Sequence, residues 1–368
     1  MINKERLLNS FLNYVKIDSE STHEKNMADF LKKELEDLGF KVNIDSSSFE
    51  TGSDTGNIIA YLDGDCCCEP LLLSCHMDTV VPGKGVKPVV KDGFVYSDGS
   101  TILGSDDKSG IAEIIEAVRS AKEQNIKTIP LEICFSVCEE IGLLGAKAVD
   151  FSKFKSKKAL VFDGGGSAGT IVKSAPGQVS FTVDFIGKSS HAGSAPEKGV
   201  SAVIAAADAI SNMELLRIDE ETTANIGTFE ASFPTNIVPD KAHIVGEVRS
   251  RNIDKLNANV KKIQKAIDDS CEKFGARAET EFKTMYEPYA HSEDFHLIQK
   301  VKSACEKLDI PTVVKNGGGG SDANIMNKHG IDAIVLSSGM TKVHTKEEFI
   351  KIKDMEDTAE IILELIKA

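Results

Sequence analysis

The segment LLLSCHMD, residues 71–78, decides the fold, because a run of apolar residues ends abruptly in His76 and Asp78. Similar apolar runs occupy residues 57–62, 131–137 and 159–162, and a helical pattern fills residues 108–122. Short apolar runs that alternate with helical segments are typical of a mostly parallel sheet covered by helices. We therefore predict an α/β domain built around this segment.

The pattern changes near residue 175, where GQVSFTVDFIG alternates between apolar and polar residues as a strand does. The segments that follow predict a helix, two strands, a second helix and a last strand, at residues 200–212, 224–231, 241–250, 253–274 and 277–285. This βαββαβ order is that of a ferredoxin-like split unit. We therefore predict a lid or dimerisation domain of residues 175–285, inserted into a discontinuous catalytic domain of residues 1–174 and 286–368.

The 368 residues are 41% hydrophobic and 27% charged, as expected for a folded chain of about two domains. The formal net charge of −14 argues against a nucleic-acid partner, since phosphate binding needs clustered Lys and Arg. No stretch of about 18 apolar residues predicts a membrane span, and the opening MINKERLLNSFLNYVKI lacks the apolar block of a secretory signal. We expect a cytoplasmic protein without a nucleic-acid or membrane partner.

Three of the eight cysteines are adjacent, at Cys66, Cys67 and Cys68. Neighbouring cysteines do not easily reach the geometry of a disulfide with one another. We therefore expect reduced thiols, which agrees with a cytoplasmic location. No CxxC pair is present, so a structural zinc site made of thiolates is not expected.

Histidine and acidic residues follow the expected strands, where the loops of a parallel sheet bind ligands. Taken singly, each has an ordinary explanation: a structural histidine, an Asp that caps a helix, or a solvated Glu. Together they are harder to explain in that way, because carboxylates that directly follow buried strands need a compensating cation. Two imidazoles with several carboxylates suit zinc, with cobalt or manganese as substitutes. The residues are His76, Asp78, Asp106, Asp107, Glu139, Glu140, Asp163 and His344.

Longer motifs resemble a known family. They are LLLSCHMDTVVPGKGVKP, SDGSTILGSDDKSGIAEI, FSVCEEIGLLGAKA, VFDGGG, SAPGQ, GKSSHAG, TNIVPD and GGGGSDAN, in this order. The sequence resembles the co-catalytic zinc exopeptidases, which include peptidase T, glutamate carboxypeptidase and the aminoacylases. It is most similar to the peptidase T-like tripeptidases, over essentially the whole chain.

The resemblance implies two zinc ions per subunit. His76 would bind one ion and His344 the other. Asp106 would bridge both ions, and Glu140 and Asp163 would each complete the shell of one.

The resemblance also implies the catalytic groups. Asp78 would orient His76. Glu139 would be the general base that takes a proton from a water held between the ions and later protonates the leaving amine. Side chains of successive strand residues point to opposite faces, so Glu139 and its neighbour Glu140 are expected on a turn. Cys138 stands before them, where relatives commonly have a small residue such as glycine.

In the lid, His191 would donate a hydrogen bond to the oxyanion, in dimeric members from the partner subunit. Asn236 and Arg249 match polar residues that hold the substrate, although an exposed strand arginine explains Arg249 equally well. Gly318 and Gly319 lie in a glycine-rich loop that would let the substrate backbone approach, or would be only a flexible turn. It is not a phosphate loop, because no lysine follows the glycines. The sequence leaves open whether the protein forms a homodimer through the lid.

We therefore predict a zinc aminopeptidase that removes the first residue of short peptides, with tripeptides as the expected substrates. An N-acyl amino acid amidohydrolase of the same fold is an alternative, because the metals and Glu139 would serve either reaction. A non-catalytic binding or scaffold protein is another, although it would need neither Glu139 nor the metal ligands. No GxSxG motif points to a serine hydrolase.

Overall fold

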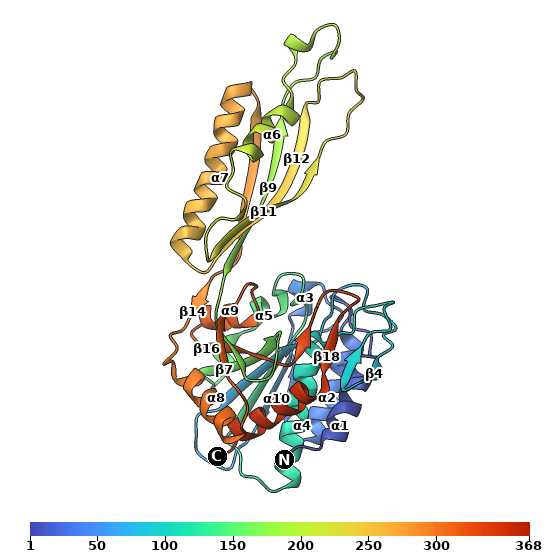
Figure 1. Ribbon diagram of the computed structural model, residues 1–368, viewed down its shortest axis with the longest axis vertical. Helices are drawn as coiled ribbons and strands as arrows, with labels where there is room; N and C mark the ends of the chain where they lie inside the picture. Colours follow the sequence, from blue (N-terminus) through green and yellow to red (C-terminus); the bar gives the residue numbers. More distant parts are fainter. The chain divides into compact units, whose positions relative to one another are not determined.

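The computed structural model describes residues 1–368 and divides into two compact units (Figure 1). Unit 1 comprises Met1–Ser174, His291–Gly317 and Ser321–Ala368, and unit 2 comprises Ala175–Ala290 and Gly318–Gly320. Each unit has its own hydrophobic core. None of the helices combines the length and the apolar character that crossing a membrane requires.

Unit 1 is built on a nine-stranded sheet with the order β1-β2-β6-β3-β7-β16-β8-β14, in which β15 pairs with β8. Strands β6, β3, β7 and β16 pair in parallel at the centre, whereas β1 and β2 form an antiparallel edge. The predicted mostly parallel α/β sheet is confirmed. The strands are β1 Lys41–Ile44, β2 Ile58–Leu62, β3 Leu71–His76, β6 Leu131–Ser136, β7 Lys158–Gly164, β8 Thr170–Ala175, β14 Tyr289–Ala290, β15 Val313–Asn316 and β16 Asp332–Ser337.

Two groups of helices accompany this sheet (Figure 1). In the first group α4 packs against β3, β7, α1 and α10, and α10 also packs against α8. The second group is a series of short helices, in which α5 packs against α3 and α9. Most of α4 is buried because its sequence GIAEIIEAV is apolar on nearly every side. The helices are α1 Lys4–Tyr14, α2 Lys25–Asp37, α3 Ser48–Thr51, α4 Ser105–Glu123, α5 Leu144–Ala148, the 3-10 turn η1 Phe151–Lys153, α8 His296–Lys307, α9 Asp322–Lys328 and α10 Ile352–Leu365.

A small antiparallel sheet in unit 1 has no counterpart in the predicted elements. Its order is β17-β18-β5-β4, with β4 Val89–Lys91, β5 Phe94–Tyr96, β17 Met340–Thr341 and β18 Phe349–Lys351. Three aromatic rings pack together on this sheet, with ring centroids no more than 5.9 Å apart. They belong to Phe94, Tyr96 and Phe349. This sheet frames the loop between β17 and β18, which carries His344.

Unit 2 has the predicted βαββαβ order, formed by β9 Gly177–Ile186, α6 Ala202–Ser211, β11 Thr222–Glu230, β12 Lys241–Ser250, α7 Ile253–Phe274 and β13 Arg277–Tyr286. A short strand, β10 Leu216–Arg217, and a 3-10 turn, η2 Pro196–Lys198, complete it. The sheet order is β10-β11-β12-β9-β13, and all of its pairs are antiparallel. Alternate residues of β9 and β12 pack with α6 and α7 to form the core.

The expectation about the adjacent cysteines is wrong, because Cys66 and Cys68 form a disulfide. The chain bends in this loop between β2 and β3, and the two Cα atoms lie 5.3 Å apart, a separation that a disulfide can span. The other six cysteines are free, and of these only Cys67 is exposed.

Candidate active site

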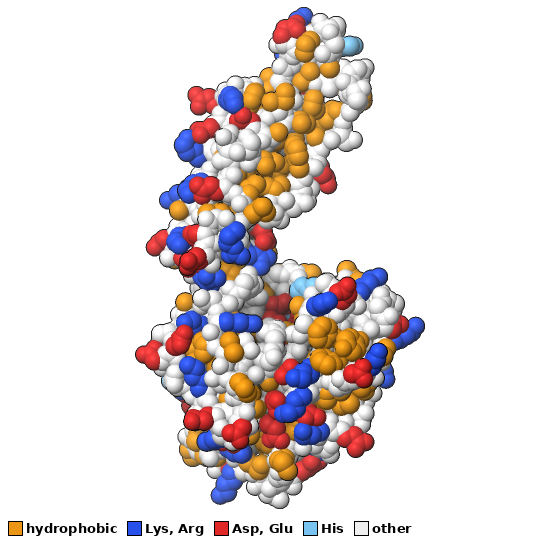
Figure 2. Space-filling model, in the orientation of Figure 1, with side chains coloured by type: hydrophobic (Ala, Val, Ile, Leu, Met, Phe, Trp, Pro, Cys, Tyr) orange, Lys and Arg blue, Asp and Glu red, His pale blue; other side chains and the backbone are white.

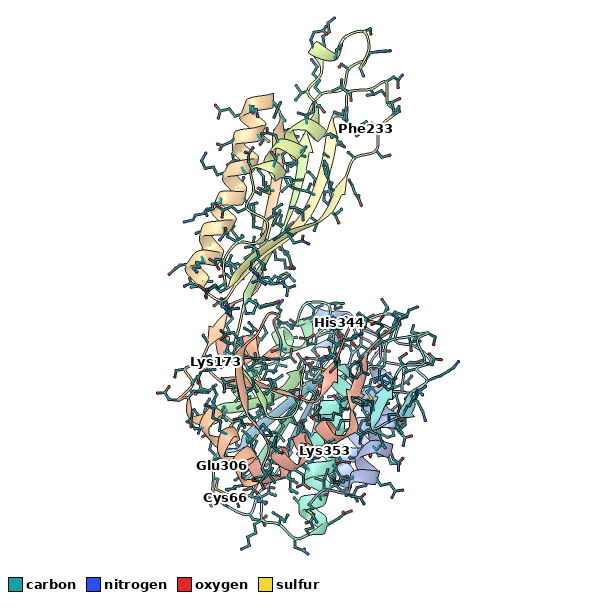
Figure 3. All side chains as sticks on the ribbon, in the orientation of Figure 1. Cys66, Lys173, Phe233, Glu306, His344 and Lys353 are labelled. Carbon is teal, nitrogen blue, oxygen red and sulfur yellow. A yellow bond between two sulfur atoms is a disulfide. The ribbon has the colours of Figure 1, made fainter.

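The predicted metal ligands of unit 1 come from five separate segments of the chain. His76 ends β3, Asp163 lies near the end of β7, and Glu140 lies in the turn that follows β6. These three strands are parallel neighbours, so their carboxyl ends meet at one edge of the sheet. Asp106 comes from the first turn of α4, and His344 comes from the loop between β17 and β18 (Figure 3).

The Asp106 carboxylate lies between the two imidazoles. Its Oδ1 is 2.9 Å from Nε2 of His76, and its Oδ2 is 3.2 Å from Nε2 of His344. Asp106 departs from helical dihedral angles, with φ −81° and ψ 104°, so the regular helix begins after it. One carboxylate therefore presents each of its oxygens to a different histidine.

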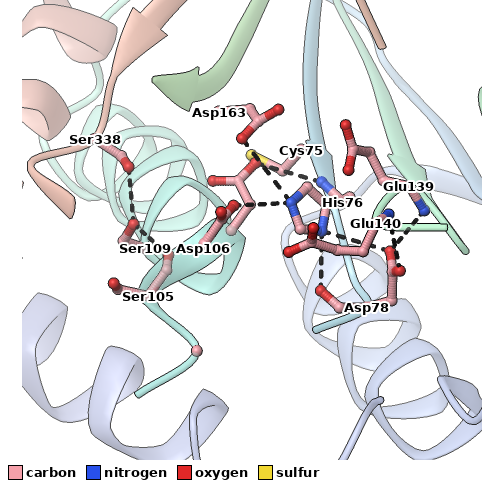
Figure 4. Close-up of polar contacts among 12 residues, drawn as sticks. Cys75, His76, Asp78, Ser105, Asp106, Ser109, Glu139, Glu140, Asp163 and Ser338 are labelled. Carbon is pink, nitrogen blue, oxygen red and sulfur yellow. Dashed lines mark hydrogen bonds and ion pairs between the residues drawn. The ribbon is translucent and has the colours of Figure 1, made fainter. Parts of the chain in front are cut away.

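Two smaller groups flank Asp106. On one side, Nε2 of His344 lies 2.9 Å from the carboxylate of Glu140. On the other side, Nε2 of His76 lies 4.0 Å from Oδ1 of Asp163 (Figure 4). Ligand atoms of His76, Asp106 and Glu140 all lie within 4.8 Å of one another, close enough to hold a metal ion. The five predicted ligands are thus brought together as His76 with Asp163, His344 with Glu140, and Asp106 between them.

The turn after β6 presents two neighbouring carboxylates to this site. Cys138 has φ +52°, in the left-handed region where glycine is favoured, and its N–H donates to Oε1 of Glu24 at 3.0 Å. Glu139 and Glu140 follow on a turn rather than on the strand, as predicted from their adjacency. Glu139 is buried, with 8% of the residue exposed, and its carboxylate has no dashed line among the residues drawn in Figure 4.

Asp78 is completely buried and connects His76 to this turn. Its backbone carbonyl lies 2.9 Å from Nδ1 of His76, whereas its carboxylate is 3.5 Å from the same nitrogen. The carboxylate accepts hydrogen bonds from the N–H groups of Glu139 and Glu140, at 2.9 and 3.2 Å, and from the Ser21 hydroxyl at 2.7 Å. Asp78 therefore contacts both the histidine and the turn that presents the two carboxylates.

The electrostatics of this cluster favour a cation. Burial and neighbouring carboxylates raise the pKa of Glu139 and Asp163, and burial raises the pKa of Glu140. Hydrogen bonds to Asp106 and Glu140 raise the pKa of His344 to about 10. Several buried carboxylates with two imidazoles form a donor set that fits zinc or a similar divalent ion.

Two buried acidic residues close to the site were missed by sequence reasoning. Asp322 lies at the start of α9, and its Oδ2 accepts a 2.5 Å hydrogen bond from the Ser136 hydroxyl, while burial raises its pKa to about 6. It belongs to the motif GGGGSDAN, in which the glycines are the more prominent signal. Glu348 lies four residues after His344 and binds the backbone before Asp106. No spacing rule in the sequence points to Glu348.

Unit 2 brings two of the predicted lid residues together. The chain segments that carry His191 and Asn236 pair through a 2.9 Å hydrogen bond from the N–H of Ala192 to the carbonyl of Asn236. Nδ1 of His191 accepts from the N–H groups of Gly193 and Ser194, at 3.1 and 3.2 Å. A neutral imidazole with Nδ1 as acceptor carries its proton on Nε2. The exposed His191 is therefore set up as a hydrogen-bond donor.

Arg249 lies at the other end of the unit 2 sheet. It pairs with Gln178 near the start of β9, whereas the His191 segment follows the end of that strand. Glu247 holds its guanidinium with two hydrogen bonds of 2.8 and 3.1 Å. The structure therefore does not group Arg249 with His191.

The two glycines named as substrate-binding residues lie in open space. A Cβ added at Gly318 or Gly319 would meet nothing within 4 Å. At Gly320, by contrast, it would approach the ring of Tyr286 to 2.4 Å. Packing therefore demands glycine at position 320 and leaves the surface of positions 318 and 319 free.

Comparison with known proteins decides the family. Residues 72–368 match the model of peptidase family M20/M25/M40. The chain belongs to this peptidase family. The predicted resemblance is confirmed, and the M20 chain is a hydrolase of peptide bonds.

Three relatives of this M20 peptidase span its full length. The crystal structure of aminopeptidase PepT from Bacillus cereus is 42% identical with a TM-score of 0.94, covering 99% of this chain and 98% of that one. The structure of a tripeptidase from Staphylococcus aureus is 37% identical with a TM-score of 0.97, covering 100% and 98%. The Bacillus subtilis protein YqjE, described as uncharacterized, is 43% identical over 100% of this chain and 99% of that protein.

Proposed function

We propose that this M20 peptidase is a di-zinc aminopeptidase that removes the N-terminal residue from short peptides, with tripeptides as preferred substrates. The observation that carries the proposal is the Asp106 carboxylate, whose two oxygens face His76 and His344 at 2.9 and 3.2 Å. A single ion in tetrahedral coordination would not use two imidazoles and three carboxylates. Two ions that share Asp106 would use all five groups.

In this proposal the chain's own residues divide the work. When bound, the two ions polarise the scissile carbonyl and lower the pKa of the attacking water. Glu139 accepts the proton of that water and later gives it to the leaving amine. Its position supports this role, because Glu139 is buried beside the ligands and Asp78 holds the turn that carries it.

His191 supplies a donor for the negative charge that develops on the carbonyl oxygen. The two backbone N–H groups that bind Nδ1 support this proposal, because they keep the proton on Nε2. Asn236, paired with the same loop, would hold the substrate nearby. Arg249, Gly318 and Gly319 remain proposed substrate contacts at the other end of unit 2.

The names of two relatives support the choice of substrate. One is described as an aminopeptidase and the other as a tripeptidase, and both are more than 35% identical over nearly the whole chain. A carboxylate-rich site also offers a partner for a substrate ammonium group. Acetylation of the amino terminus removes that group and leaves a buried acidic side chain without its partner.

The two units would then have different tasks. Unit 1 would be the catalytic domain, and unit 2 would be a lid that also forms a homodimer. Figure 2 shows hydrophobic side chains gathered on the surface of unit 2. The exposed large apolar residues of this unit include Ile204, Leu216 and Phe229. A contiguous apolar surface supports a protein contact, whereas single exposed apolar side chains do not. We propose the cytoplasm as the site of action.

The decisive test is a panel of di-, tri- and tetrapeptides, each free and N-acetylated, assayed with zinc-, cobalt- and manganese-loaded protein. The proposal predicts cleavage of free tripeptides with release of the first residue, and slow cleavage of the acetylated series. Preference for acetylated substrates would instead identify an acyl-amino-acid hydrolase. Glu139→Gln protein, loaded in the same way, is the control for contaminating peptidases.

A further inference from the structure

Glu348 is a buried carboxylate in the loop that carries His344. It lies four residues after His344 and immediately before β18, with 1% of its surface exposed. Its own N–H donates to the carbonyl of Thr345 at 3.1 Å, which closes the chain between the two residues into a turn. The position of Glu348 is therefore tied to that of His344.

The Glu348 carboxylate binds the backbone that leads into Asp106. Oε2 accepts from the N–H groups of Leu103 and Gly104 at 2.7 and 2.9 Å. Oε1 accepts from the N–H and the hydroxyl of Ser105 at 2.7 and 2.5 Å, and from the N–H of Asp106 at 3.3 Å. Both carboxylate oxygens of Glu348 therefore accept hydrogen bonds from the short segment of residues 103–106.

This arrangement resembles the way in which a bound anion is held by backbone N–H groups. Gly104 has φ +76°, and the turn at this residue lets successive N–H groups point at one carboxylate. No Lys or Arg lies within ion-pair distance of Glu348, although the buried Lys108 attracts it at longer range. Charge-assisted hydrogen bonds from the backbone and from Ser105 therefore compensate most of the cost of its burial. Removing the carboxylate would leave several buried donors without an acceptor.

The contact joins the segments of two proposed metal ligands that are far apart in the sequence. His344 lies just before Glu348, and Asp106 directly follows the backbone that Glu348 binds. The ligand atoms themselves lie 3.2 Å apart, from Nε2 of His344 to Oδ2 of Asp106. A carboxylate that fixes one segment against the other also fixes this separation.

We propose that Glu348 is a positioning residue that holds the Asp106 segment against the His344 segment and so sets the spacing of the two metal sites. The inference rests on the proposed function, because it assumes that Asp106 and His344 bind metal. Glu348 itself contacts neither the ions nor the substrate in this role. Residues that orient metal ligands commonly change metal affinity or activity by about 10- to 100-fold when they are replaced.

The test compares Glu348→Gln and Glu348→Asp with Glu347→Gln. The amide of the first variant turns an N–H₂ toward backbone donors, whereas the second keeps the charge on a shorter side chain. Glu347 is the matched control, because it is the adjacent residue and its side chain is 75% exposed and pairs only with Lys342. Three experiments are made: exchange of the amide hydrogens of residues 103–106 in metal-free protein, zinc affinity by competition with a chelator, and steady-state kinetics that give kcat and KM for a tripeptide.

We expect Glu348→Gln to lose amide protection at residues 103–106 and to bind the weaker of two zinc ions about 10- to 100-fold less tightly. kcat should fall by a similar factor, while KM changes less than about threefold. Glu348→Asp should lie between this variant and the wild type, and Glu347→Gln should match the wild type. If Glu348→Gln does not fold, smaller losses of amide protection, zinc affinity and kcat in Glu348→Asp test the positioning role of Glu348.

Zinc affinity and amide protection equal to those of Glu347→Gln would overturn the positioning role, even if the wild type cleaves tripeptides. A loss of melting temperature with unchanged zinc affinity would show only a stabilising contact and would also overturn it. If the wild type cleaves no peptide, the proposed function fails, yet the zinc and exchange measurements still decide the role of Glu348.

Discussion

The carboxylate of Asp78 accepts a 2.9 Å hydrogen bond from the backbone N–H of Glu139. The residue that was expected to orient a metal histidine therefore also holds the turn of the proposed general base. Its second oxygen accepts from the N–H of Glu140, and its backbone carbonyl faces Nδ1 of His76. One buried residue thus connects two proposed ligands and the proposed catalytic base.

Replacing Asp78 with Asn should lower kcat and zinc affinity together, each by about 10- to 100-fold. The amide cannot accept from both N–H groups, so Glu139 and Glu140 lose their fixed orientation. Ser21→Ala is the control, because it removes one hydrogen bond to the same carboxylate and leaves the turn bonded. Steady-state rates and zinc competition measure both effects, and equal behaviour of the two variants would argue against the role of Asp78 in this turn.

Replacing Glu139 with Gln should reduce turnover by about 10²- to 10⁴-fold while the metals stay bound, since the amide keeps the shape but cannot take the proton. Metal content by elemental analysis and single-turnover rates on a tripeptide test this expectation. Turnover close to that of the wild type would exclude Glu139 as the base.

Replacing His191 with Ala should lower kcat by about 10²- to 10³-fold without changing the metal content, because its proposed partner is the oxyanion. His243→Ala is the control in the same unit, since His243 is partly exposed and pairs with Asp184 at 2.8 Å. Similar rates for the two variants would assign His191 a merely structural role.

Removing the metals should destabilise the protein more at high pH than at low pH. In the metal-free chain burial raises the pKa of Glu139 and Asp163, and hydrogen bonds raise that of His344 to about 10. A raised folded-state pKa means that the folded chain holds more protons than the unfolded chain, so this stability is present at low pH and is lost as the pH rises toward about 10. Melting temperatures of metal-free and zinc-loaded protein at pH 6.5 and pH 9 should therefore differ more at pH 9. If zinc raises the melting temperature by the same amount at pH 6.5 and at pH 9, the proposed link between the raised pKa values and metal binding is contradicted.

The elements with a strong periodic pattern were predictable from the sequence. The helix at residues 253–274 was predicted with the bounds of α7, and the apolar runs at residues 71–75 and 131–137 became β3 and β6. The strands β4, β5, β17 and β18 have only two or three residues each, too few to show a period. They form because segments far apart in the sequence pair with one another.

The residues of the site also divide into those that stand in a visible sequence motif and those that depend on contacts between remote segments. His76, Asp106, Glu139, Glu140 and His344 stand in motifs that the sequence displays, and these side chains lie at one edge of the sheet. Glu348 and Asp322 act through hydrogen bonds to remote backbone or hydroxyl groups, and such contacts leave no spacing pattern. The Cys66–Cys68 disulfide is not expected from the sequence, because the bend that brings the two residues together is not visible in a run of three cysteines.

The most direct test of the account is to titrate metal-free protein with zinc while hydrolysis of a free tripeptide is followed and bound zinc is counted. The account predicts that activity reaches its maximum at two zinc ions per chain, and that the Glu139→Gln variant binds the same two ions without turnover. Full activity at one ion per chain, or two bound ions with no hydrolysis by the wild type, would contradict it.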